Sequence, residues 1–240
     1  MKKLKLVLLF DIDGTLIKTG GAGKNAMEDA FQELFQIKDG LARISFAGST
    51  DLGIFDKALA LNKIERKNAV PEPVFRAKYL ALLQKYLIEN PEGQELLPGV
   101  ADFLEHCQKR DDIYVSLVTG NYQAGANIKL SHFEIDHYFR EGAFGCDFAD
   151  RNLLPPLAIK RIADQGFMLP PKNKIWIIGD TVKDIECAKK NGLPSLITFT
   201  GFSPREDILR DKPEIAMETL ETFQDFLGQV LDKLLVSFIR

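Results

Sequence analysis

The apolar positions of the chain form two kinds of run. Short continuous apolar runs without alternation predict strands that are buried on both faces, at 4–10, 113–118, 174–178 and 195–200. Longer stretches with apolar residues at helical spacing predict helices. These lie at 22–36, 72–89, 100–109, 156–165, 182–190 and 219–235, with others after Ser49-Thr50 and after Asn121. Strands that alternate with helices favour a parallel sheet covered on both faces.

The pattern divides the chain unevenly. The span 18–95 has no strong strand pattern and predicts helices only, whereas the strand and helix patterns alternate elsewhere. We therefore expect an α/β fold, a Rossmann-like parallel sheet built from 1–17 plus 96–240, with an inserted α-helical cap at 18–95.

Polar side chains follow three of the predicted strands. Because the carboxyl ends of parallel strands meet at one edge of a sheet, where ligands bind, these side chains should lie together. They are Asp11 and Asp13 after the first strand, Thr119 and Asn121 after the strand at 113–118, and Asp180 and Asp184 after the strand at 174–178.

The acids at this edge predict a metal site. Asp11, Asp13 and Asp180 would repel one another unless a cation lies between them. Mg²⁺ suits such a site, because it prefers oxygen ligands, keeps some waters, and is usually held by one or two carboxylates plus a substrate phosphate. We therefore expect Mg²⁺ and a phosphate group at this edge.

Composition narrows the class further. The chain has 240 residues and a net charge of −3 with acids and bases mixed, and this disfavours nucleic acid as a partner. Its three cysteines are widely spaced, as is typical of a protein in the reducing cytosol. No signal-peptide pattern appears, and no segment approaches the ~20 apolar residues of a membrane span. We expect a cytoplasmic protein with no membrane partner.

Three motifs carry a family resemblance. "DIDGTL" (11–16), "LVTGN" (117–121) and "IIGDTVKD" (177–184), in this order, resemble the first, second and fourth signature motifs of the haloacid dehalogenase (HAD) superfamily. The helical block after the first motif resembles that family's cap. Over nearly the whole chain, the sequence is most similar to phosphoglycolate-phosphatase-like hydrolases. The resemblance implies a Mg²⁺-dependent phosphatase for small phosphate monoesters.

The resemblance also implies a role for each motif residue. Asp11 would be the nucleophile that forms an aspartyl-phosphate, and Asp13 the general acid and then the base. The backbone carbonyl of Asp13, with Asp11 and Asp180, would bind Mg²⁺. Thr119 and the amide of Gly120 would hold phosphate oxygens.

Other motif residues would support these groups. Asn121 would help to bind the substrate, and Asp184 would orient the metal's waters or the third-motif cation. Gly14 and Thr15 would shape the turn after the first strand. Asp180 is also expected to cap the helix that follows it.

The third motif departs from the family pattern, which has a lysine there. Arg151 lies about where that lysine should fall, and Lys160 lies inside a predicted helix. We favour Arg151, because a guanidinium can neutralise and grip phosphoryl oxygens.

Other functions stay open. A phosphomutase would share the core motifs, and a catalytically silent binding protein could use the same fold, although the presence of Asp11 and Asp13 argues against silence. Lys24, Arg43 and 48–51 are candidates to face the site from the cap, the alternative being solvated surface. The expected partner is a small phosphorylated metabolite, and the chain could be a monomer or a homodimer.

Overall fold

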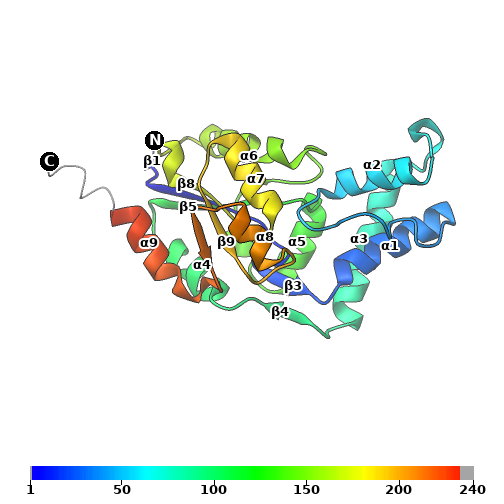
Figure 1. The fold of residues 1–240 in the computed structure, drawn as a ribbon, viewed down its shortest axis with the longest axis horizontal. Coiled ribbons are helices and arrows are strands. Elements are labelled where there is room, and N and C mark those ends of the chain that lie inside the picture. Colours follow the sequence, from blue (N-terminus) through cyan, green and yellow to red (C-terminus); the bar gives the residue numbers. More distant parts are fainter. Residues whose placement is uncertain (1, 233–240) are drawn as a thin grey trace.

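The computed structural model describes residues 2–232 and contains a six-stranded, wholly parallel sheet with helices on both faces (Figure 1). The strand order is β10-β9-β8-β2-β5-β6. These strands are β2 (Leu6–Phe10), β5 (Ile113–Val118), β6 (Gly142–Ala143), β8 (Ile175–Gly179), β9 (Ser195–Thr198) and β10 (Ile215–Met217). The predicted Rossmann-like α/β fold is confirmed.

The central strand β2 shows why its apolar run is continuous. Leu6, Leu8 and Phe10 belong to the apolar cluster on one face of the sheet, and Val7 and Leu9 to the cluster on the other. Every residue of the strand is buried, because helices cover both faces. The polar residues begin only where the strand ends, at Asp11.

Helices cover the two faces separately (Figure 1). The face of Phe10 carries residues of α4 (Val100–Gln108), α5 (Gln123–His132) and α9 (Phe223–Asp232). The opposite face carries residues of α6 (Leu154–Asp164) and α7 (Val182–Asn191), and α8 (Arg205–Arg210) packs beside α7. These helices lie over the faces of the sheet, so the edge at the carboxyl ends of β2, β5 and β8 can face the rest of the chain.

Three helices form a block of their own at one end of the molecule (Figure 1). We call α1 (Ala22–Phe35), α2 (Asp51–Leu61) and α3 (Glu72–Glu89) the cap block. Their apolar side chains form a cluster separate from the two on the sheet. Two short strands, β3 (Ile17–Thr19) and β4 (Gln94–Leu96), pair antiparallel where the chain enters and leaves the block. The domain boundaries themselves stay a prediction.

Several short elements carry no sequence signal. The apolar pattern did not predict β3, β4, β10 or α8. It also did not predict the parallel pair β1 (Lys2–Lys3) and β7 (Phe167–Met168). Elements of two to six residues contain too few positions for a period to show. The end of the helix predicted at 219–235 lies outside the described residues from 233 on. Short 3₁₀ turns occupy Arg66–Asn68, Asp136–Tyr138, Arg151–Leu153, Lys172–Lys174 and Leu220–Thr222.

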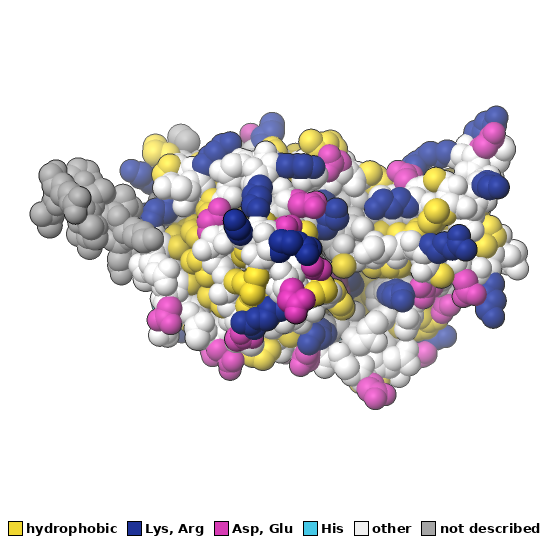
Figure 2. Space-filling model, in the orientation of Figure 1, with side chains coloured by type: hydrophobic (Ala, Val, Ile, Leu, Met, Phe, Trp, Pro, Cys, Tyr) yellow, Lys and Arg dark blue, Asp and Glu magenta, His cyan; other side chains and the backbone are white. Residues whose placement is uncertain are grey.

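The surface carries both signs of charge. Figure 2 shows basic and acidic side chains interspersed over the visible face. Within residues 2–232, every helix is too short or too polar to cross a membrane.

The aromatic centre of the cap block gives a stability prediction. Phe75 is fully buried, with its ring stacked on Phe55 at 4.7 Å between centroids. Truncating Phe75 to alanine leaves a cavity, so Phe75→Ala should lower the free energy of unfolding by about 3–5 kcal/mol. Urea denaturation checks this. Val74→Ala is the matched control, because Val74 is 48% exposed on the same helix. Equal losses in the two variants would contradict the assigned packing.

Candidate active site

The hollow that contains most of the predicted site residues lies between the carboxyl ends of the central strands and the cap block. Its volume is about 560 Å³. Core residues that line it include Asp11, Asp13, Gly120, Asn121, Lys129 and Arg151, and cap residues include Lys24, Met27, Ile44, Asp51, Ile54 and Tyr79. The cavity therefore brings five of the predicted site residues together under the cap, whereas Thr119, Asp180 and Asp184 are fully buried and do not line it.

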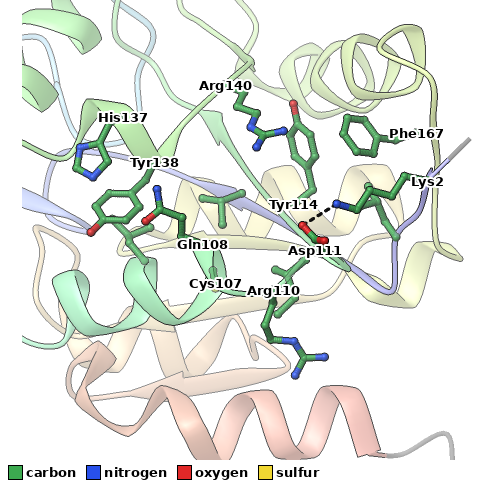
Figure 3. A pocket seen from close by; sticks show the side chains of 14 residues that line it. Lys2, Cys107, Gln108, Arg110, Asp111, Tyr114, His137, Tyr138, Arg140 and Phe167 are labelled. Carbon is green, nitrogen blue, oxygen red and sulfur yellow. Dashed lines mark ion pairs between the residues drawn. The ribbon is translucent and has the colours of Figure 1, made fainter.

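A second hollow lies at the amino ends of the strands, away from the motif residues (Figure 3). It measures about 100 Å³ and is lined by residues such as Cys107, Tyr114 and His137. Lys2 and Asp111 form an ion pair of 2.7 Å at its side. Because it sits near the amino end of β5, it is remote from the motif residues.

A buried carboxylate cluster lies beside the larger cavity, and one of its members, Asp11, lines the cavity wall. Asp11, Asp180 and Asp184 offer oxygens that all lie within 4.8 Å of one another. Burial raises the pKa of Asp180 well above its ordinary value, and the neighbouring charges of Asp184 and Asp11 raise it further. Burial likewise raises the pKa of Asp11, although Arg151 opposes the shift. A hard divalent cation fits this donor set, because it would restore the balance of charge among oxygen ligands.

The turn after β2 holds Asp180 in place. Thr15 Oγ1 donates to Asp180 Oδ1 at 2.9 Å, and the Phe202 amide donates to Oδ2 at 3.0 Å. Gly14 has a φ of +85°, and a Cβ there would lie 2.5 Å from Asp180 Oδ2. Only glycine suits that position, both for its backbone conformation and for the space.

The prediction that Asp180 caps the next helix is wrong. Thr181 is the N-cap of α7, and its side chain accepts a hydrogen bond from the Asp184 amide. Asp184 Oδ2 accepts in return from the Thr181 amide at 3.0 Å. Asp180 is already engaged by Thr15 and Phe202, so the cap falls to the next residue. This capping box fixes Asp184 beside the carboxylate cluster.

Arg151 supplies the positive charge of the cluster. It is 7% exposed, its Nη2 lies 3.2 Å from Asp11 Oδ2, and the same nitrogen donates to Asp184 Oδ1. Burial alone would lower the pKa of Arg151, but the charges of Asp11 and Asp184 raise it, so the guanidinium stays charged. Its buried Nε has no hydrogen-bond partner among residues 2–232.

Lys160, the alternative cation, lies elsewhere. It projects from α6 with 71% of its side chain exposed and pairs with Asp164 at 2.6 Å. The structure thus brings Arg151 to the carboxylates and leaves Lys160 on the surface.

The loop after β5 presents a hydrogen-bond donor. Thr119 Oγ1 accepts from the Asn121 amide at 3.3 Å and from Asn121 Nδ2 at 2.9 Å. A hydroxyl has two acceptor lone pairs and one proton. Because Asn121 occupies the lone pairs, the proton of Thr119 is left to donate to another oxygen, and a hydrogen bond from Thr119 to Asp11 opposes the rise in the pKa of that carboxyl.

The side chain of Asp13 stands apart from the carboxylate cluster. Its Oδ2 accepts from Asn121 Nδ2 at 2.9 Å and from Lys129 Nζ at 2.6 Å. Lys129 was not among the predicted site residues. The sequence feature that could have revealed it is its position on α5, where Lys129 lies on the buried side of the helix with Ala126 and Leu130.

The start of α2 joins the cap block to the loop after β5. The Asp51 amide donates to the Gly120 carbonyl at 2.7 Å, and the Tyr122 amide donates to Asp51 Oδ2 at 2.7 Å. Thr50 Oγ1 donates to the Ala149 carbonyl at 2.7 Å. A Cβ on Gly120 would lie 2.0 Å from the Ser49 carbonyl oxygen, so this close approach requires glycine.

The structure places some, but not all, of the cap residues considered from the sequence in the cavity wall. Lys24, Gly48, Ser49 and Asp51 line the cavity, whereas Arg43 and Thr50 do not. Thr50 is the N-cap of α2, so the helix expected after Ser49-Thr50 begins at Asp51. From the sequence, Asp51 is hard to distinguish from any acid in the first turn of a helix.

The parallel sheet, the cap block and the carboxylates beside the cavity together define an α/β enzyme with a capped site. The family model for haloacid dehalogenase-like hydrolases matches residues 8–198, and the chain belongs to this family. The predicted superfamily and the class of hydrolase are thereby confirmed.

Individual relatives agree with this assignment. The chain is 24% identical over 213 residues to the phosphoglycolate phosphatase of Aliivibrio fischeri, covering 88% of this chain and 92% of the relative. It is 26% identical over 234 residues to that of Escherichia coli, covering 91% of each. The fold is shared with CbbY from Rhodobacter sphaeroides in complex with phosphate, at a TM-score of 0.69 and 18% identity, over 94% of this chain and 98% of that one. A predicted phosphoglycolate phosphatase from Haemophilus somnus gives a TM-score of 0.64 at 22% identity, over 93% and 97%.

The raised pKa of Asp51 predicts how the stability of the protein depends on pH. Burial raises its pKa from 3.8 to about 7, although Lys129 and the Tyr122 amide oppose the shift. The folded protein therefore keeps a proton that the unfolded chain loses, and this stabilisation disappears as the pH rises through 7. Relative to Asp51→Asn, the wild type should lose on the order of 1–4 kcal/mol of unfolding free energy between about pH 4 and pH 8.

Urea unfolding of both proteins across this range measures the difference. Asp56→Asn is the control, because Asp56 lies on the same helix and pairs with Arg66 at the surface. Its pH dependence should follow that of the wild type. If Asp51→Asn also followed the wild type, Asp51 would not carry the buried proton.

Proposed function

We propose that this protein is a Mg²⁺-dependent phosphatase that hydrolyses small phosphate monoesters through an aspartyl-phosphate on Asp11. The observation that carries the proposal is the pairing of one buried guanidinium, Arg151, with Asp11 and Asp184, where Arg151 and Asp11 both line a capped cavity. Such a site has both a carboxylate to attack phosphorus and a cation to hold the phosphoryl group. The likeness to phosphoglycolate phosphatases supports the same reaction class.

The metal ligands would be Asp11, Asp180 and the backbone carbonyl of Asp13, with Asp184 orienting the groups around them. When bound, the ion would neutralise charge on the phosphoryl group and on the carboxylates. Thr15 and the Phe202 amide would keep Asp180 in position for this task.

The reaction would proceed in two displacements. In the first, Asp11 attacks phosphorus, the bond from phosphorus to the ester oxygen breaks, and Asp13 gives its proton to that oxygen. In the second, water attacks the aspartyl-phosphate, Asp13 takes the proton, and inorganic phosphate leaves with Asp11 restored. The Thr119 hydroxyl, the Gly120 amide and Arg151 Nε would hold the phosphoryl oxygens throughout.

The leaving group would occupy the cavity under the cap. Met27, Ile44, Ile54 and Tyr79 give part of its wall an apolar character. At about 560 Å³, the cavity falls in the range of pockets that enclose ligands much larger than a two-carbon acid. We therefore propose small phosphorylated metabolites as the substrate class, with sugar phosphates tested beside phosphoglycolate. A cytoplasmic location, and a monomeric or homodimeric state, belong to the same proposal.

The first test is release of inorganic phosphate from a panel of small phosphate esters. We expect release with Mg²⁺ and none with chelator, and Asp11→Asn should lower the rate by at least about 1,000-fold, because the nucleophile is lost. Circular dichroism should show that the variant remains folded. If folded, metal-loaded wild type releases phosphate from no ester, a mutase or a silent binding protein becomes the better reading.

The second test compares the two candidate cations. Arg151→Ala should reduce kcat/KM by about 100-fold or more, because it removes the charge that faces both Asp11 and the substrate. Lys160→Ala, the matched control, should stay within about twofold, as is usual for an exposed pair. A larger loss in Lys160→Ala than in Arg151→Ala would reassign the third motif.

A further inference from the structure

Lys129 is a buried charge that the proposed mechanism does not use. It is 3% exposed and comes from α5, outside the three sequence motifs. Its Nζ donates to Asp13 Oδ2 at 2.6 Å and to Asn121 Oδ1 at 2.7 Å. Burying an ammonium group costs several kcal/mol of folding free energy unless the group is paired. Here the contacts with Asp13 and Asn121 offset that cost and connect Lys129 to the predicted site residues.

The groups around Lys129 form a closed ring of hydrogen bonds. Asn121 Nδ2 donates to the same Asp13 oxygen that Lys129 contacts, while Asn121 Oδ1 accepts from Lys129. Asn121 also donates to Thr119. The ring therefore links the side chain of Asp13 to the loop that would bind phosphate.

The cap block closes over this ring. A Cβ on Gly23, in the first turn of α1, would lie 3.1 Å from Lys129 Nζ and 4.0 Å from Tyr79 Oη. Asp51, from α2, also interacts with the charge of Lys129. Only 4% of the Lys129 side chain is exposed, so its interactions are stronger than at a surface, although 29% of the Asp13 side chain is exposed.

We propose that Lys129 is a positioning residue that holds the Asp13 carboxylate toward the leaving group of the substrate. This inference rests on the proposed phosphatase activity. Because Asp13 Oδ2 accepts from both Lys129 and Asn121, Oδ1 is the oxygen that exchanges the proton with the ester oxygen. Without the ammonium, Asp13 can rotate away, and its proton no longer reaches the bond that breaks.

A leaving-group comparison separates positioning from a general structural role. An alkyl phosphate needs a proton on its departing oxygen, whereas p-nitrophenyl phosphate releases a stabilised phenolate that leaves without one. The quantity to measure is kcat/KM, which reports the steps up to departure of the leaving group. The two substrates are p-nitrophenyl phosphate and the alkyl phosphate that the wild type hydrolyses fastest, both with Mg²⁺ and the full-length protein.

We expect Lys129→Met to lower kcat/KM for the alkyl phosphate by about 100-fold or more, and for p-nitrophenyl phosphate by less than about fivefold. Asp13→Asn should show the same selectivity, and Lys160→Met, at an exposed lysine, should leave both values within about twofold. Equal losses for the two substrates in Lys129→Met would overturn the positioning role and leave Lys129 a structural ion pair.

Two further controls complete the test. If Lys129→Met does not fold by circular dichroism, Lys129→Gln replaces it, because the amide can still donate to Asp13, and a smaller but still selective loss is expected. An unselective loss in Lys129→Gln would likewise count against the proposal. Failure of the proposed function would look different, since the wild type itself would then hydrolyse neither ester.

Discussion

The structure depends on keeping three carboxylates buried within 4.8 Å of one another. Left alone, such a cluster opposes folding, because both burial and like charges disfavour the ionised forms. Arg151 offsets part of this cost through Asp11 and Asp184, and the remaining charge makes the site suitable for a divalent cation. The same excess of negative charge that costs stability would therefore bind the metal ion, and the ion together with Arg151 would attract the phosphate.

The parallel sheet makes this cluster possible. Its central strands β2 and β8 are buried on both faces, so their carboxyl ends deliver Asp11 and Asp180 to one edge on rigid supports. Local bonding then orients each side chain. The capping box of α7 holds Asp184, and the turn at Gly14 and Thr15 holds Asp180. Such bonds pre-organise the site, because they fix the side chains before any substrate is present.

The cap block also affects the geometry of the loop after β5. Asp51 bonds to the backbone on both sides of Asn121, and Asn121 bonds in turn to Asp13 and Thr119. The position of the cap and the geometry of the phosphate loop are thus connected through short hydrogen bonds. Gly23 and Asp51 of the cap block also lie near Lys129, so the cap borders the ring that contains Lys129. The chemistry proposed for Asp13 would then depend on the cap as well as on the core.

The sequence by itself determined the sheet, its helices and the acids at its edge, because buried strands and helices leave periodic patterns and carboxyl ends of parallel strands converge. It also singled out Arg151, which the structure places against Asp11. Only the tertiary structure decided the places of Lys129 and Asp51, and that Thr181 rather than Asp180 caps α7. The register of Lys129 on α5 indicates a buried lysine, and Asp51 reads as an acid in the first turn of a helix, but neither pattern shows which group the side chain meets. What such residues do depends on which distant groups fold against them.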